Sequence, residues 1–124
     1  MTILLDSDVL IEVLRGHDAG IVERWTRVMQ SDVTVMYTPV TAAEIWVGAR
    51  HGEERRIERV FACMEAVPVD AETGRIAGLL MQRFAKSHGV ELADAIIAAC
   101  AILTGGELWT RNRKHYPMPG IEFY

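Results

Sequence analysis

The sequence contains few cysteines and no long run of apolar residues. Cys63 and Cys100 have neither the spacing of a metal clip nor the density of a disulfide scaffold, so we expect both to be buried thiols. No stretch approaches the roughly 20 unbroken apolar residues that a membrane-spanning helix requires. The first residues also lack the pattern of a secretory signal. These absences predict a soluble, cytoplasmic protein without membrane association.

Positive charge is also scarce. Thirteen Lys and Arg stand against 17 Asp and Glu, which gives a net charge of −4. Because phosphate binding needs clustered basic side chains, this balance argues against broad electrostatic attraction to nucleic acid. Two local basic stretches remain, RHGEERRIER at 50–59 and TRNRKH at 110–115. The first is at least as well explained as a solvated helix face, whereas the second is short and loop-like and is the better candidate for contacting a substrate.

Apolar residues make up half of the 124-residue chain. A chain of this length can bury roughly two-thirds of its unfolded surface in one core, so we expect a single domain over 1–124. Strand-like runs are predicted at 2–6, 33–39, 66–69, 107–110 and 120–124. Helical patterns are predicted at 8–16, 19–30, 41–52, 53–65, 71–88 and 91–106. This alternation is typical of an α/β domain with a parallel sheet and helices on both faces.

Three carboxylates occur where a core should lie. Asp6 ends the first apolar strand, Glu44 lies on the helix after the second strand, and Asp94 stands about one turn into the most apolar helix. Sites in parallel α/β sheets form at the carboxyl ends of the strands, where these residues are expected. A buried carboxylate is costly unless it is paired, hydrogen-bonded or bound to a metal.

Most of these acids also have an ordinary explanation. Asp8 is best explained as the cap of the helix that begins there. Thr41 followed three residues later by Glu44 has the spacing of a capping box, and Asp94 is placed to interact with a helix dipole. Asp6 has no such role. Together, three carboxylates at one edge repel unless a cation lies between them, and oxygen ligands without Cys or His favour Mg²⁺ or Mn²⁺. Such a site can hydrolyse a phosphodiester without a protein nucleophile.

Four segments, in order along the chain, resemble the PIN domain of VapC-type toxins. They are LLDSDVLIEVLRG (4–16), TPVTAAEIWVG (38–48), LADAIIAACA (92–101) and LWTRNRKHYPMPGIEFY (108–124). The resemblance implies a PIN-like three-layer α/β sandwich with a central, mainly parallel sheet. It also implies a metal-dependent ribonuclease that acts on RNA, a cognate VapB-like antitoxin, and usually a homodimer.

The resemblance assigns roles residue by residue. Asp6, Glu44 and Asp94 take the family's three main acidic positions as metal ligands, and Thr110 and Asn112 match its polar pair, with Asn112 among the catalytic residues. Asp8 and Thr41 are expected to support the site. Three basic residues at the rim are expected to hold RNA phosphates: Arg111, Arg113 and Lys114.

One departure from the family concerns the loop TRNRKHYP. Many members carry a fourth carboxylate there, whereas this loop has no Asp or Glu. His115 lies closest to the missing position, so either His115 or Asn112 replaces the acid, or the site has only three. The preferred interpretation of His115 is a solvated loop histidine, because Lys114 and Tyr116 flank it.

Two other functions are compatible with parts of the sequence. An Asp-x-Asp at the end of a first strand also resembles haloacid-dehalogenase-like phosphatases, in which the first Asp is a nucleophile. However, Leu10 stands where that family has Thr or Val. The second alternative is a catalytically weak PIN scaffold that binds a protein partner through Trp46, Phe61 and Met64, although core packing explains these residues equally well.

Overall fold

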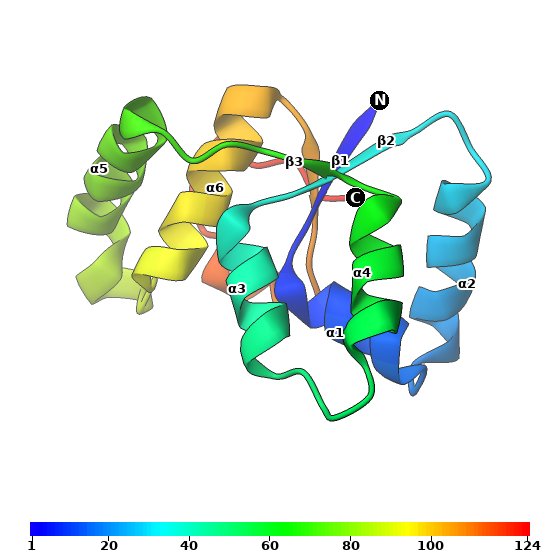
Figure 1. The fold of residues 1–124 in the computed structure, drawn as a ribbon. Helices are drawn as coiled ribbons and strands as arrows, with labels where there is room; N and C mark the ends of the chain where they lie inside the picture. The colour runs from blue at the N-terminus through cyan, green and yellow to red at the C-terminus, as the bar shows by residue number, and fades with distance from the viewer.

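The computed structural model covers residues 1–124 and contains one parallel sheet. Its strands are β1 (Thr2–Leu5), β2 (Thr34–Tyr37), β3 (Glu65–Ala66) and β4 (Glu107–Trp109). They lie in the order β3-β2-β1-β4, and every neighbouring pair is parallel. β1 is therefore central. It runs from the N-terminus at the top of Figure 1 down to the first helix.

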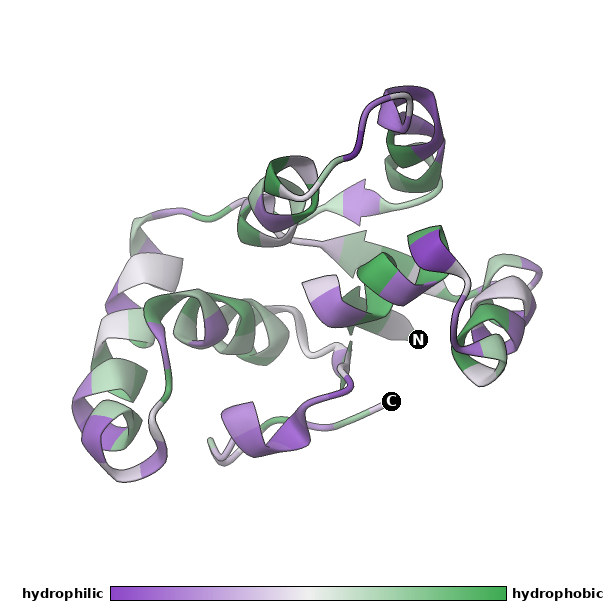
Figure 2. Cartoon of the chain, turned by 90° about the horizontal axis from the view of Figure 1, so that it is seen from below, coloured by the Kyte–Doolittle hydropathy of each residue, from purple (hydrophilic) through white to green (hydrophobic).

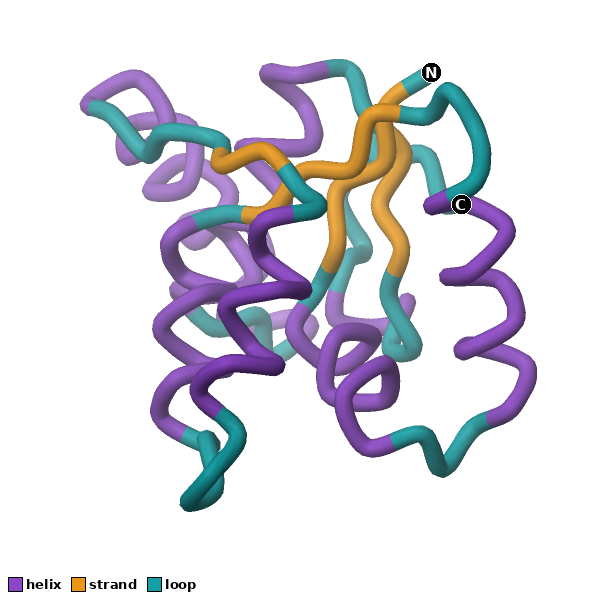
Figure 3. The backbone as a smooth tube through the Cα atoms, turned by 45° about the vertical axis from the view of Figure 1, so that its right-hand side comes forward, coloured by secondary structure: helices purple, strands orange, loops and turns teal.

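Six helices cover the sheet. They are α1 (Ser7–Arg15), α2 (Ala19–Met29), α3 (Pro39–Val47), α4 (Glu54–Ala62), α5 (Ala71–His88) and α6 (Leu92–Thr104), and a short 3-10 turn, η1, covers Arg113–His115. In Figure 1, α5 and α6 lie on one side of the strands, and α2 and α4 lie on the other. Figure 3 shows the same strands enclosed by helices. The predicted α/β sandwich is confirmed.

Side-chain alternation along β1 divides the core into two parts. Leu4 packs into a cluster that includes residues of α5 and α6, whereas Ile3 and Leu5 pack into a second cluster with residues of α1, α2 and α4. Successive side chains of a strand point to opposite faces, so a short apolar strand serves both layers. Figure 2 shows hydrophobic and hydrophilic stretches on most helices, as expected of helices packed on one side. No helix combines the length and apolarity that crossing a membrane requires.

Several expected boundaries were wrong. The strand predicted at 66–69 is only Glu65–Ala66, because Pro68 has no N–H with which to continue the ladder. The strand predicted at 120–124 is a single bridge between Leu108 and Phe123. Cys63 is exposed after the last turn of α4, contrary to expectation, whereas Cys100 is buried.

Candidate functional site

A polar cleft of about 280 Å³ opens beside the carboxyl end of β1. Its walls come from the start of α1, from α3, from the α5–α6 connection with the first turn of α6, and from the loop after β4. No hydrophobic residue lines it; the lining residues are Asp6, Ser7, Asp8, Glu44, Gly89, Glu91, Asp94, Asn112 and His115. The fold thus brings together Asp6, Glu44 and Asp94, which are far apart in the sequence.

Asp6 is held by three hydrogen bonds. It is the N-cap of α1, and its Oδ1 accepts from the Ser7 N–H at 2.8 Å. Its Oδ2 accepts from the Thr110 hydroxyl at 2.9 Å and from the Tyr116 hydroxyl at 2.8 Å. A carboxylate offers about four acceptor positions, so roughly one stays free for a ligand. The cleft therefore contains an anionic group with a fixed orientation.

Tyr116 is a site residue that the sequence did not reveal. Its side chain is buried, and burial, together with the neighbouring Asp6, raises the pKa of its phenol far above the ordinary value. The hydroxyl therefore remains a proton donor. Ser7 was also missed, and its hydroxyl donates to Glu44 at 3.3 Å. Both contacts join segments distant in sequence, so no local pattern could have indicated them.

Asp8 is not the helix cap that the sequence predicted. Asp6 fills that position, because the helix begins one residue earlier than expected. The Asp8 Oδ2 instead accepts from the Arg111 N–H at 3.1 Å and from the Thr110 hydroxyl at 3.4 Å. Its Oδ1 is buried without a hydrogen-bond partner. Burial, and secondly the charge of Asp6, raises the pKa of Asp8 to about 6.

Glu44 is free to act in the cleft because another residue caps its helix. The Thr38 side chain accepts from the Thr41 N–H at 3.1 Å, so the capping box expected between Thr41 and Glu44 is absent. The Thr41 hydroxyl is buried and donates instead to the Leu5 carbonyl at 3.4 Å. Burial, and then repulsion from Asp6, raises the pKa of Glu44.

Asp94 occupies the third position of α6, where its Oδ2 accepts from the Glu91 N–H at 3.2 Å. Asp94 therefore also has a structural role at the helix start, a hydrogen bond to the backbone of the N-cap residue, where the sequence had suggested only an interaction with the helix dipole. Burial nevertheless raises the pKa of Asp94, and it outweighs the opposing effects of this hydrogen bond and of His115. The cleft therefore disfavours negative charge on three of its carboxyl groups: Asp8, Glu44 and Asp94.

The donor set fits a hydrated hard cation. No three acidic, His or Cys side chains converge closely enough to ligate one ion together. Mg²⁺, however, commonly binds through one or two carboxylates and keeps several of its waters. Oxygen donors, mutual repulsion between carboxylates, and the unpaired Asp8 Oδ1 all match that mode.

The loop after β4 supplies the remaining wall. Asn112 and His115 both line the cleft, and the Asn112 Nδ2 lies 3.1–3.2 Å from the ring nitrogens of His115. His115 thus faces the carboxylates while keeping part of its surface in solvent.

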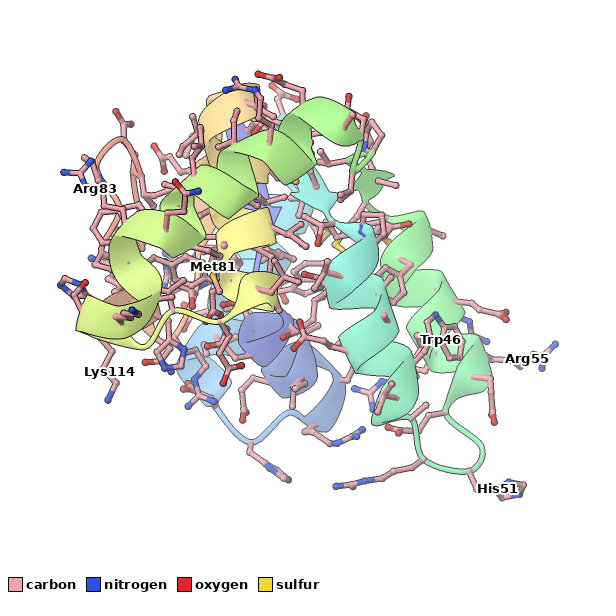
Figure 4. All side chains as sticks on the ribbon, turned by 90° about the vertical axis from the view of Figure 1, so that its left-hand side faces the viewer. Trp46, His51, Arg55, Met81, Arg83 and Lys114 are labelled. Carbon is pink, nitrogen blue, oxygen red and sulfur yellow. The ribbon has the colours of Figure 1, made fainter.

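The basic residues of this loop differ in their availability. The Arg111 guanidinium pairs with Glu12 at 2.9 Å and lies 3.7 Å from Asp18. Arg113 stacks over the Phe123 ring and donates to the Tyr124 carbonyl at 3.3 Å. Lys114 is exposed and forms no ion pair, and it projects outward in Figure 4. Of the three expected phosphate contacts, Arg111 is ion-paired, and only Lys114 has neither an ion pair, a ring-stacking contact nor a side-chain hydrogen bond.

The surface expected for a protein partner is only partly exposed. Trp46 is 40% exposed, and its neighbour Val47 is 88% exposed. Phe61 and Met64 pack against the core cluster that contains Ile3. Of the two parts of this expected surface, α3 therefore exposes large apolar side chains and the end of α4 does not.

Comparisons with known proteins agree with this fold. The family model described as PIN domain matches residues 3–120. The chain is 37% identical over 117 residues to Ribonuclease VapC10 of Mycobacterium tuberculosis, which covers 94% of this chain and 86% of that protein. The crystal structure of VapBC2 from Rickettsia felis bound to a promoter DNA fragment superposes with a TM-score of 0.82 at 17% identity, covering 100% of this chain and 98% of that chain. A toxin-antitoxin complex from Klebsiella pneumoniae gives a TM-score of 0.77 at 25% identity, covering 95% and 93% of the two chains.

Proposed function

Because the chain belongs to the PIN-domain family, we propose that it is a metal-dependent endoribonuclease, the toxin of a VapBC-type toxin–antitoxin pair. The observation that carries this proposal is the wholly polar cleft, in which Asp6, Glu44 and Asp94 meet. The similar protein VapC10 is named a ribonuclease. The phosphatase alternative is abandoned, because the family is different and Asp6 is held by three donors instead of standing free as a nucleophile.

The residues of the cleft would have separate roles in binding the cation and the RNA. Asp6 would bind the cation through its remaining acceptor position, and Glu44 and Asp94 would bind the ion or its waters. When bound, Mg²⁺ or Mn²⁺ would polarise the phosphodiester and make a water more acidic. Asn112 would position a phosphate oxygen with its amide, supported by His115, and Lys114 would hold a neighbouring phosphate.

The proposed partners follow from the same family membership. We expect a VapB-like antitoxin to inhibit the enzyme and two copies of the chain to form a homodimer. We expect the enzyme to cleave its RNA substrate in the cytoplasm. The Rickettsia felis and Klebsiella pneumoniae structures are a VapBC2 assembly and a toxin-antitoxin complex, which supports the antitoxin. Residues 1–124 would act as a single PIN domain.

The test is cleavage of single-stranded RNA with Mg²⁺ or Mn²⁺, with and without chelator. The wild-type protein and Asp32→Asn should cleave only when metal is present, because Asp32 is an exposed acid outside the cleft. Asp6→Asn should abolish cleavage while the protein stays folded. Cleavage that survives both the chelator and Asp6→Asn would reject the proposal. Absence of cleavage with intact antitoxin binding would favour the non-enzymatic scaffold.

A further inference from the structure

We propose that Asp8 supplies the fourth carboxylate of this cleft, acting as an oxygen donor to the hydrated divalent cation. This inference rests on the proposed function and assigns a further residue to the same site. The loop at 110–117, where many relatives carry the fourth acid, contains no Asp or Glu. Asp8 comes from the opposite wall, on α1, and lines the same cleft.

The first observation is the unpaired oxygen. Asp8 Oδ1 is buried and has no hydrogen-bond partner in the protein. Buried polar atoms in folded proteins almost always have a partner, whether a protein group, a water or an ion. A carboxylate oxygen left unpaired beside a polar cleft therefore indicates a ligand from within that cleft.

The second observation is how Asp8 is held. Its other oxygen, Oδ2, accepts from the Arg111 N–H and from the Thr110 hydroxyl, so the loop that lacks an acid fixes the Asp8 carboxylate instead. The single proton of the same Thr110 hydroxyl is shared with Asp6, whose Oδ2 lies closer, at 2.9 Å against 3.4 Å for Asp8. One loop residue therefore lies between the two carboxylates of the Asp-x-Asp pair at the wall of the cleft, and neither contact uses Asp8 Oδ1.

A purely structural role would explain only half of this arrangement. The capping role belongs to Asp6, and fastening the loop uses only Oδ2 of Asp8. An asparagine would fasten the loop equally well, because its carbonyl oxygen can accept from the Arg111 N–H. Asp8→Asn therefore separates loop fastening from cation binding.

The matched control is Glu12→Gln. Glu12 lies one turn further along α1, carries the same charge and pairs with Arg111, but it does not line the cleft. Its substitution removes one negative charge near the same loop without touching the proposed ligand set. A general electrostatic effect on cation binding would thus be shared by both variants.

The experiment is calorimetric titration of Mn²⁺ into the RNA-free protein, beside RNA cleavage. We expect wild type and Glu12→Gln to bind Mn²⁺ alike, and Asp8→Asn to bind it at least about 10-fold more weakly, because the loss of even an outer partner of a metal site typically costs about that much. Circular dichroism and urea unfolding would verify the fold of each variant. Asp8→Ser, with a smaller polar side chain, is expected to lose Mn²⁺ affinity as well.

The outcomes distinguish the role of Asp8 from the nuclease activity itself. If wild type binds Mn²⁺ and cleaves RNA, and folded Asp8→Asn and Asp8→Ser bind Mn²⁺ as wild type does, the role of Asp8 is overturned and the nuclease stands. If wild type neither binds Mn²⁺ nor cleaves RNA, the nuclease is overturned and the role of Asp8 falls with it. Equal weakening by Glu12→Gln would also refute the specific role of Asp8.

Discussion

Replacing Asp8 with asparagine is predicted to stabilise the metal-free protein more at neutral pH than at acidic pH. Burial, and secondly the Asp6 charge, raises the pKa of Asp8 from 3.8 to about 6 in the folded chain. Between these two values the folded state holds more protons than the unfolded state. The contribution of Asp8 to the free energy of unfolding therefore falls as the pH rises through this window, and it is level above the window.

The magnitude follows from the size of the pKa change. A rise from 3.8 to about 6 corresponds to roughly 3 kcal/mol when fully expressed. Between about pH 4.5 and about pH 7.5, the contribution of Asp8 to the free energy of unfolding would change by about 2 kcal/mol of this total. Because the Asp8 side chain is only partly buried, solvent screening reduces the expected effect to about 1 kcal/mol.

The assay is urea unfolding of wild type and Asp8→Asn in chelator at both pH values. Other groups change the stability with pH in the opposite direction, such as Asp70, whose pKa is lowered by the hydrogen bond from the Thr73 N–H. Their contributions cancel when the two proteins are compared. We expect the variant's stability relative to wild type to improve by about 1 kcal/mol on going from the acidic to the neutral condition. Saturating Mg²⁺ should remove this advantage at neutral pH. An equal stability difference at both pH values would show that the pKa of Asp8 is not raised in the folded protein.

Three further predictions concern other residues of the site. Tyr116→Phe removes a buried donor to a charged group, so we expect urea unfolding to show a loss of about 1–2 kcal/mol and RNA cleavage to slow. Tyr37→Phe, outside the cleft, serves as its control, and equal behaviour of the two variants would contradict the prediction. Thr38→Ala removes the cap of α3 and should cost about 1 kcal/mol in the same assay; an unchanged midpoint would mean that the cap contributes nothing. Lys114→Ala should weaken RNA binding and reduce the dependence of log K on log salt concentration by about 0.7. Arg111→Ala should change this slope less, because the Arg111 guanidinium is already paired. The reverse order would exclude Lys114 as the main phosphate contact.

Local signals in the sequence were sufficient for the elements with strong ends. The helix predicted at 71–88 is α5, with the expected bounds. Asp70 caps it through the Thr73 N–H at 3.0 Å, and Gly89 ends it at φ 64°, a conformation that glycine adopts without strain. The elements with weak ends were placed less well. The last strand has only one bridge to the sheet, at Leu108, and such pairing between distant segments has no local signature.

The candidate site shows the same division. Sequence pattern and family resemblance selected Asp6, Glu44 and Asp94, because each is expected near one edge of the sheet and matches an acidic position of the family. They could not assign the caps correctly, since a cap is decided by where the backbone turns. Asp6 rather than Asp8 caps α1, and Thr38 rather than Thr41 caps α3.

Residue type and short-range spacing were enough to predict the alternation of strands and helices, the family, and the carboxylates that line the cleft. The hydrogen-bond partners of those carboxylates depend on how distant segments pack together. Tyr116 donates to Asp6 across 110 positions, and Thr110 joins Asp6 to Asp8. These hydrogen bonds depend on β1 and β4 lying side by side, an arrangement set by burial in the two core clusters. That packing fixes the orientation of the carboxylates and leaves one oxygen of Asp8 without a partner.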